Sequence, residues 1–157
     1  MRNLIIYISG KYSDRDFKAI EANIQKARLT SAKIWELGFT ALCPHLNTYH
    51  FEQICKCTYE DYINGDLALL NNCHGIFMLN NWQESKGAKI EHEYAEDLKI
   101  KIFYSLDELQ KHKEELQWNL TQSKIRESDK ILSPERTETQ ISEREDMTSY
   151  PQEHLDD

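Results

Sequence analysis

The sequence has no apolar run that approaches the length of a membrane span. This absence excludes a protein held in the bilayer by a hydrophobic helix. The first eight residues contain only a short apolar stretch, which is too brief for a signal peptide and predicts a strand. We therefore expect a cytoplasmic protein that makes no membrane contact.

Positive charge is scarce as well. The 157 residues include 19 Lys and Arg against 27 Asp and Glu, which gives a net charge of −8. A protein that binds the nucleic-acid backbone in general needs a basic surface, so we expect no nucleic-acid polymer as partner. A small anionic ligand held by a few local groups stays compatible with this balance.

Cofactor signatures are also missing. The sequence contains neither G-x-G-x-x-G nor G-x-x-x-x-G-K-[ST], which argues against a dinucleotide or triphosphate cradle. The four cysteines are expected to be reduced thiols in the cytoplasm. Cys55 and Cys57 are separated by one residue, which fits no standard zinc pattern. We predict no cofactor and no metal, and keep a metal-binding regulator as an alternative.

What is present is an alternation of strands and helices. Apolar runs at residues 4–8, 39–43, 75–79 and 99–104 predict strands, and helical periodicity follows each of them, with the last helix ending near Trp118. Residues 45–57 show no period and predict a loop. Such alternation predicts an α/β fold, a flavodoxin-like or Rossmann-like three-layer sandwich with a mainly parallel sheet of four to five strands. We place this domain at residues 1–118 and an acidic, disordered tail at residues 119–157.

One helix carries an unusual residue on its inward stripe. The positions that should face the core are Ala88, Glu91, Ala95 and Leu98. A buried carboxylate is costly unless it is paired or used, and the small alanines leave room for a ligand to reach it. A solvated surface glutamate is the alternative interpretation.

Ligands of parallel sheets bind beyond the carboxyl ends of the strands. That rule gathers residues 9–13, the segment after Pro44, residues 80–87 and the turn after Tyr104 around one crevice. Two loop-to-helix junctions there suit phosphate or carboxylate, although plain capping explains them equally well. Trp82 could stack on a base and His45 could contact a ligand, or both could be structural. The predicted binding residues are Gly10, Lys11, Ser13, His45, Trp82, Ser85 and Gly87.

Two carboxylates and a phenol near this crevice suit cleavage at the anomeric carbon of a sugar. Glu91 would attack the carbon, Tyr7 would orient Glu91 by a hydrogen bond, and Asp66 would protonate the leaving group. Alternatively, Tyr7 is a core tyrosine and Asp66 an ordinary helix residue.

Three segments resemble the nucleoside 2-deoxyribosyltransferase-like superfamily: Tyr-Ile-Ser-Gly at residues 7–10, Gly-Asp-Leu at residues 65–67 and Ser-Lys-Gly-Ala-Lys-Ile-Glu at residues 85–91. This superfamily includes deoxyribosyltransferases, 2′-deoxynucleoside 5′-monophosphate N-glycosidases and small bacterial and phage proteins without a settled activity. The resemblance spans about residues 4–104. It implies flavodoxin-like topology and a homo-oligomer.

The resemblance also implies roles. The nucleophilic glutamate of the superfamily falls on Glu91, its strand-end tyrosine on Tyr7 and its acidic residue on Asp66. In the monophosphate glycosidases, a phosphate-contacting serine falls on Ser85 and a histidine on His45. This sequence departs from the pattern after the third strand, where two asparagines replace an acidic residue of the transferases, and in the first loop, where a lysine replaces an arginine of the glycosidases.

The predicted function is therefore cleavage of the N-glycosidic bond of a 2′-deoxynucleoside or its 5′-monophosphate, with release of the free base. Transfer of the sugar to a second base is one alternative. A nucleotide-binding module without turnover is another. The sequence specifies neither the base nor the need for the phosphate.

Overall fold

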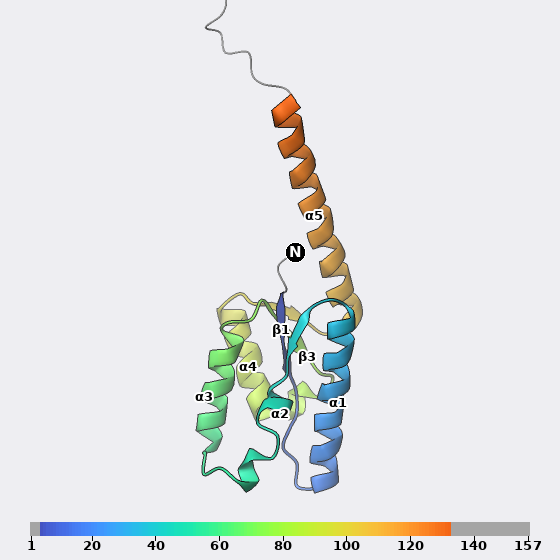
Figure 1. The fold of residues 1–157 in the computed structure, drawn as a ribbon. Helices are drawn as coiled ribbons and strands as arrows, with labels where there is room; N and C mark the ends of the chain where they lie inside the picture. The colour runs from blue at the N-terminus through green and yellow to red at the C-terminus, as the bar shows by residue number, and fades with distance from the viewer. Residues whose placement is uncertain (1–3, 133–157) are drawn as a thin grey trace, which may run out of the picture. The chain divides into compact units, whose positions relative to one another are not determined.

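A parallel sheet of four strands forms the centre of the part of the chain that is described, with helices against both faces (Figure 1). The computed structural model describes residues 4–132. The chain divides into two units, residues 1–114 and 115–157, and the sheet lies in the first. The elements of the sheet and its connections are β1 (Ile5–Ser9), α1 (Phe17–Glu36), β2 (Thr40–Leu42), α2 (Pro44–Asn47), η1 (Phe51–Gln53), α3 (Tyr59–Leu70), β3 (Gly75–Met78), η2 (Trp82–Glu84), α4 (Lys86–Asp97) and β4 (Lys101–Phe103).

The strand order is β2-β1-β3-β4, so β1 is central and every neighbouring pair is parallel. Tyr7 lies opposite Leu42 on one side and Ile76 on the other. Because strand side chains alternate between faces, Ile6 and Ile8 join the core under α1, whereas Tyr7 joins the core under α3 and α4. This confirms the predicted α/β class with a parallel sheet and helices on both faces.

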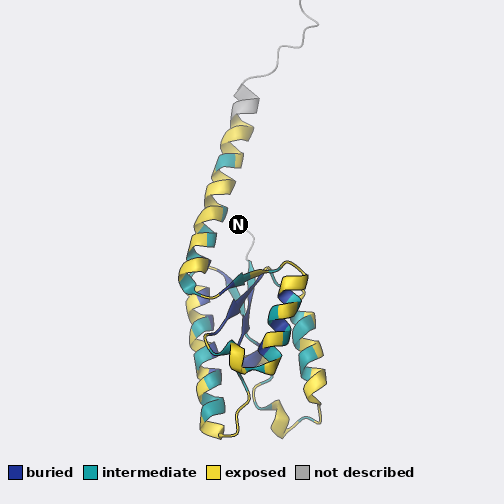
Figure 2. Ribbon diagram, turned by 180° about the vertical axis from the view of Figure 1, so that it is seen from behind, coloured by how far each residue is buried: buried dark blue, intermediate teal, exposed yellow. Residues whose placement is uncertain are grey.

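Figure 2 shows the buried strands in dark blue between helices whose outward faces are yellow. The α4 stripe follows the prediction at Ala88, Glu91 and Ala95, which are all buried. The prediction was wrong for Leu98, which is 45% exposed. Leu98 is the C-terminal cap of α4, and the next residue, Lys99, has a φ of 57° that turns the chain toward β4.

The predicted loop at residues 45–57 contains two short helical turns, α2 and η1. Pro44 starts α2 at its first position, where the fixed φ of proline suits a helix and its missing N–H costs no hydrogen bond. The segment is too short to show a hydrophobic period, which explains why periodicity missed it. The loop prediction is corrected for these residues only.

The last helix, α5 (Leu106–Leu132), does not end near Trp118 as predicted. No glycine or proline interrupts the sequence from residue 106 to residue 133, and the serine and threonine hydroxyls bond to carbonyls within the helix, as Thr121 does to Gln117 at 3.0 Å. Low hydrophobicity therefore did not stop the helix. Residues 133–157, to which the prediction of an acidic disordered tail still applies, lie outside the described residues.

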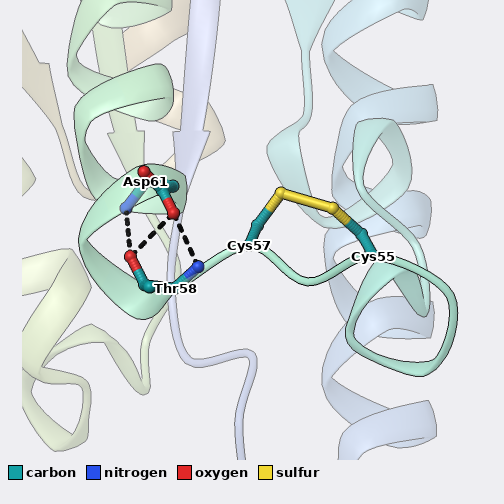
Figure 3. Close-up of a disulfide and its surroundings, with 4 residues drawn as sticks. All are labelled: Cys55, Cys57, Thr58 and Asp61. Atoms are coloured by element: carbon teal, nitrogen blue, oxygen red, sulfur yellow. Dashed lines mark hydrogen bonds between the residues drawn. A yellow bond between two sulfur atoms is a disulfide. The ribbon is translucent and has the colours of Figure 1, made fainter.

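Cys55 and Cys57 form a disulfide in the turn before α3 (Figure 3), whereas the sequence prediction was two thiols. Their Cα atoms are 5.4 Å apart, a separation that a disulfide spans readily. The prediction rested on the expected compartment and not on geometry. The next residue, Thr58, begins α3 with a capping box in which its N–H donates to Asp61 Oδ2 at 2.7 Å.

No helix within residues 4–132 combines the length and apolar character that crossing a bilayer would require. Over the same range, no three or more His, Cys, Asp or Glu side chains are gathered as metal ligands would be.

Candidate active site

A cavity of about 730 Å³ lies beyond the carboxyl ends of β1, β2 and β3. Its walls come from the loop after β1, the start of α2, residues 59–66 of α3 and the start of α4. Three of the four segments predicted to surround a crevice therefore meet there. The turn after Tyr104 does not line it, because β4 lies at the edge of the sheet on the far side of β3.

Glu91 lines this cavity and is only 6% exposed. The Tyr7 hydroxyl donates a hydrogen bond of 2.8 Å to Oε1, and the Ser9 hydroxyl donates to Oε2. Tyr7 and Ser9 are two residues apart on β1, so both side chains point to the α4 face of the sheet. Both carboxyl oxygens are thus held in place by hydroxyls from the central strand.

Burial raises the pKa of Glu91 from 4.5 to about 7. The hydrogen bonds from Ser9 and Tyr7 lower this pKa, and the charge of Asp66 raises it slightly, but the loss of hydration is the largest influence. The pKa of Tyr7 is raised well above 10 by burial and by the neighbouring Glu91. Tyr7 therefore stays protonated at neutral pH and remains a hydrogen-bond donor.

Asp66 lines the same cavity from α3, and burial raises its pKa from 3.8 to about 6. Both carboxyl groups are consequently shifted toward neutral pH, as is typical of acid–base sites. The pKa of Glu91 is the higher of the two. If Glu91 works ionised and Asp66 works protonated, only a minority of molecules holds both states at once.

The predicted cation of the first loop, Lys11, is paired with carboxylates. Its Nζ lies 2.8 Å from Asp14 and 3.2 Å from Glu84, so it links the loop after β1 to η2. Ser13 lines the cavity from the same loop. Any anionic ligand would have to compete with two carboxylates for the Lys11 ammonium group.

His45 is buried and lines the cavity. Its Nε2 lies 3.1 Å from the carbonyl oxygen of Lys11, and because a carbonyl only accepts, this nitrogen carries the proton. Burial lowers the pKa of His45, which keeps the ring neutral at pH 7. His45 therefore positions the Lys11 backbone, and its ring packs edge-on against Tyr12 with the centroids 5.7 Å apart.

The start of α4 lines the cavity through Ser85, Lys86 and Gly87. The Ser85 hydroxyl accepts from the Ala88 N–H at 3.2 Å, which makes it the predicted helix cap. A Cβ on Gly87 would lie 3.1 Å from Ile63 Cδ1 and 3.3 Å from the Tyr59 hydroxyl. Gly87 thus allows α3 and α4 to approach at the cavity wall.

Trp82, predicted to stack on a base, does not line the cavity. Its ring stacks on His92 with centroids 4.5 Å apart and an interplanar angle of 6°. The side chain also packs against the core under α4. Trp82 therefore makes an aromatic contact outside the cavity lining, and its stacking on a base stays a prediction.

Gly10 lines the cavity, yet its main constraint is packing. A Cβ there would lie 2.6 Å from Leu79 Cδ1 and 2.8 Å from Leu79 Cβ. We predict that Gly10→Ala lowers the free energy of unfolding by about 1–3 kcal/mol, measured by urea denaturation. Gly65→Ala is the control, because that glycine lies inside α3 with nothing within 4 Å and should gain about 0.5–1 kcal/mol. Equal stability of the two variants would contradict the packing argument.

Ser9 is the site residue that sequence reasoning missed. Its signal was present, because Ser9 follows Tyr7 by two residues in a strand and must share its face. In the sequence prediction, Ser9 belongs only to the segment of residues 9–13 at the crevice, and its side chain has no role. The structure shows that it supplies the second donor to Glu91.

Removal of this donor should shift the titration of Glu91. We predict that Ser9→Ala raises the pKa of Glu91 above about 7, by up to about one unit, because one hydrogen bond to the ionised form is lost. NMR titration of the glutamate side-chain carboxyl carbons measures this pKa. Ser31→Ala, which removes a buried hydroxyl bonded to Ala27 within α1, should leave it unchanged. An unchanged pKa in Ser9→Ala would show that the Ser9 contact is not formed in solution.

Comparisons with known proteins place the chain in a family without assigning an activity. No curated protein matches the sequence. Among solved structures, the chain is similar to a 2-deoxyribosyltransferase from the psychrotolerant bacterium Bacillus psychrosaccharolyticus, with 14% identity, a TM-score of 0.48 and coverage of 62% of this chain and 69% of that one. A likeness this distant carries no argument about chemistry. The model of a domain of unknown function, DUF4406, matches residues 4–104. Because that match includes most of the chain and the whole sheet, the protein belongs to the DUF4406 family.

Proposed function

We propose that the protein cleaves the N-glycosidic bond of a 2′-deoxynucleoside and releases the free base, with Glu91 as the nucleophile. The observation that carries this proposal is the buried Glu91 carboxyl group, held by Tyr7 and Ser9 against a cavity large enough for a nucleoside. A buried carboxyl without an ion pair costs stability, so its retention favours a use in chemistry.

The proposed reaction has two steps. The Glu91 carboxylate forms a bond to C1′ of the sugar while the bond from C1′ to the base nitrogen breaks, and the bonding pair leaves with the base. Asp66 gives its proton to the departing base. Water then attacks C1′, frees Glu91 and returns a proton to Asp66, which balances the cycle as hydrolysis with retention. A second base in place of water would give transfer from the same intermediate.

The charges around the cavity favour an uncharged nucleoside over its 5′-monophosphate. The described lining has five carboxyl side chains and two lysines, and Lys11 is already paired with Asp14 and Glu84. Although burial keeps Glu91 and Asp66 partly protonated near neutral pH, the remaining three acidic groups outnumber the lysines. A phosphate dianion would meet net repulsion there.

The test is chromatography of the purified protein incubated with each 2′-deoxynucleoside and each 5′-monophosphate. We expect release of base from at least one deoxynucleoside and weaker release from its monophosphate. Release that requires a second free base would assign the transferase reaction. Binding without release under any condition would leave a nucleoside-binding module and overturn the catalytic role of Glu91.

A further inference from the structure

Helix α3 brings two polar side chains to the cavity one turn apart. Tyr62 and Asp66 are four residues apart, so they lie on the same face of the helix, and both line the cavity. Asp66 already has a part in the proposed reaction. Tyr62 has none so far, and neither composition nor periodicity singled it out from the other tyrosines.

The Tyr62 hydroxyl is buried and has no hydrogen-bond partner within the part of the chain that the structure describes. It is the one buried side-chain nitrogen or oxygen without a partner among the residues that the structure describes. Buried polar atoms are nearly always paired, because desolvation without a new hydrogen bond destabilises the fold. Tyr62 lines the cavity, but its hydroxyl has almost no exposed surface in the ligand-free protein, so a ligand atom becomes its partner only when the side chains around the hydroxyl shift on binding.

The other tyrosines of the site contrast with Tyr62. The Tyr7 hydroxyl donates to Glu91 at 2.8 Å. The Tyr12 hydroxyl lies 3.2 Å from Glu52 Oε2 and accepts from the His50 N–H at 3.2 Å. Tyr59 is 53% exposed and reaches solvent. Tyr62 alone of these four has a hydroxyl that is neither bonded within the described protein nor open to water.

We propose that the Tyr62 hydroxyl binds the leaving base of the substrate, beside the atom that Asp66 protonates. The inference rests on the proposed function, in which Glu91 on α4 attacks the sugar and Asp66 on α3 protonates the base. That division places the base against α3, where Tyr62 lies one turn from Asp66. A hydroxyl both donates and accepts, so it fits a ring nitrogen, a carbonyl or an amino group of a nucleobase.

Tyr62→Phe tests the proposal by two readouts that a structural tyrosine would not combine. We expect the affinity for the free base, which is the product, to fall about tenfold by calorimetry, because one neutral hydrogen bond is lost. We expect the stability of the ligand-free variant to be equal to or higher than that of the wild type, because an unpaired buried hydroxyl is removed. Tyr94→Phe on α4, which lies outside the cavity lining and packs against the core, should change neither base affinity nor turnover.

Each outcome separates this inference from the function on which it depends. Unchanged base affinity in Tyr62→Phe, with wild-type turnover, would overturn the role of Tyr62 and leave the proposed function intact. A loss of stability would show that the hydroxyl has a partner in the free protein, which also overturns the role. Wild-type protein that neither binds a base nor releases one from any deoxynucleoside would overturn the proposed function itself.

Discussion

Glu91→Gln should abolish base release, with kcat reduced at least about a thousandfold, because the amide cannot form the bond to C1′. Glutamine keeps the shape of the side chain, and its amide can still bond to the hydroxyls of Tyr7 and Ser9. The cavity should therefore still bind the substrate. Turnover is measured by chromatography of released base, and binding by calorimetry with the same deoxynucleoside.

The matched control is Glu93→Gln, which makes the same chemical change on the exposed face of the same helix. We expect this control to retain wild-type turnover. A Glu91→Gln enzyme that keeps more than about a tenth of the wild-type kcat would eliminate Glu91 as the nucleophile. Mass spectrometry of a slow substrate, in which fluorine at C2′ destabilises the cationic transition state, should locate the covalent sugar on Glu91.

The same substitution should stabilise the protein above pH 7. The pKa of Glu91 is raised on folding from 4.5 to about 7, so the folded state binds the proton more tightly than the unfolded state. The free energy of unfolding therefore falls as pH rises from about 4.5 to about 7 and is flat above that. At 1.36 kcal/mol per pKa unit, ionisation costs about 3 kcal/mol at pH 8.

Glutamine has no charge to desolvate, so Glu91→Gln should recover much of that energy at pH 8 and show little gain at pH 4. Urea denaturation at both pH values measures the difference in the free energy of unfolding between the variant and the wild type. Asp66 titrates in both proteins, so its contribution to this difference largely cancels. If the variant is equally destabilised at both pH values, Glu91 contributes through packing and not through its buried charge. A gain in the free energy of unfolding that is confined to high pH would show that the protein retains Glu91 although its buried charge destabilises the fold.

Much of this site follows from periodicity alone. The 3.6-residue stripe identified Glu91 as a charge among buried positions, and the rule for parallel sheets placed it beside the loop after β1. The length and apolar character of β1 made it central, so Tyr7 had to lie near α4 or near α1. The fold class follows from the same alternation of strands and helices.

Other features depend on tertiary contacts that no periodic pattern encodes. Trp82 lies in the right segment, but its ring packs on His92 instead of the cavity. Lys11 is basic in the sequence, but folding brings Glu84 from 73 residues away to pair with it. The carboxyl groups of Asp14 and Glu84 beside Lys11 therefore make this loop-to-helix junction less suited to a phosphate than its sequence indicates. The strand period places Ser9 on the same face as Tyr7, but its contact with Glu91 also depends on how α4 packs against β1.

Asp66 should govern how base release depends on pH. With Glu91 active when ionised and Asp66 active when protonated, the rate should rise with pH up to about 6, stay level, and fall above about 7. Because the pKa of Glu91 is higher than that of Asp66, only about a twentieth of the molecules has Glu91 ionised and Asp66 protonated at the optimum pH. Asp66→Asn should lower kcat/KM about a hundredfold or more at that optimum, because the base then leaves without a proton.

The shape of the remaining pH profile assigns the two roles. Without Asp66, only the ionisation of Glu91 is left, so the rate should rise with a midpoint at or below about pH 7 to a plateau at higher pH, and the decline at high pH should vanish. If Asp66 were the nucleophile and Glu91 the acid, the residual rate would instead fall above pH 7, because it would need protonated Glu91. Asp97→Asn, at the exposed end of α4, should keep the wild-type profile. The direction of a single titration in Asp66→Asn thus distinguishes the two assignments, which give the same profile in the wild type.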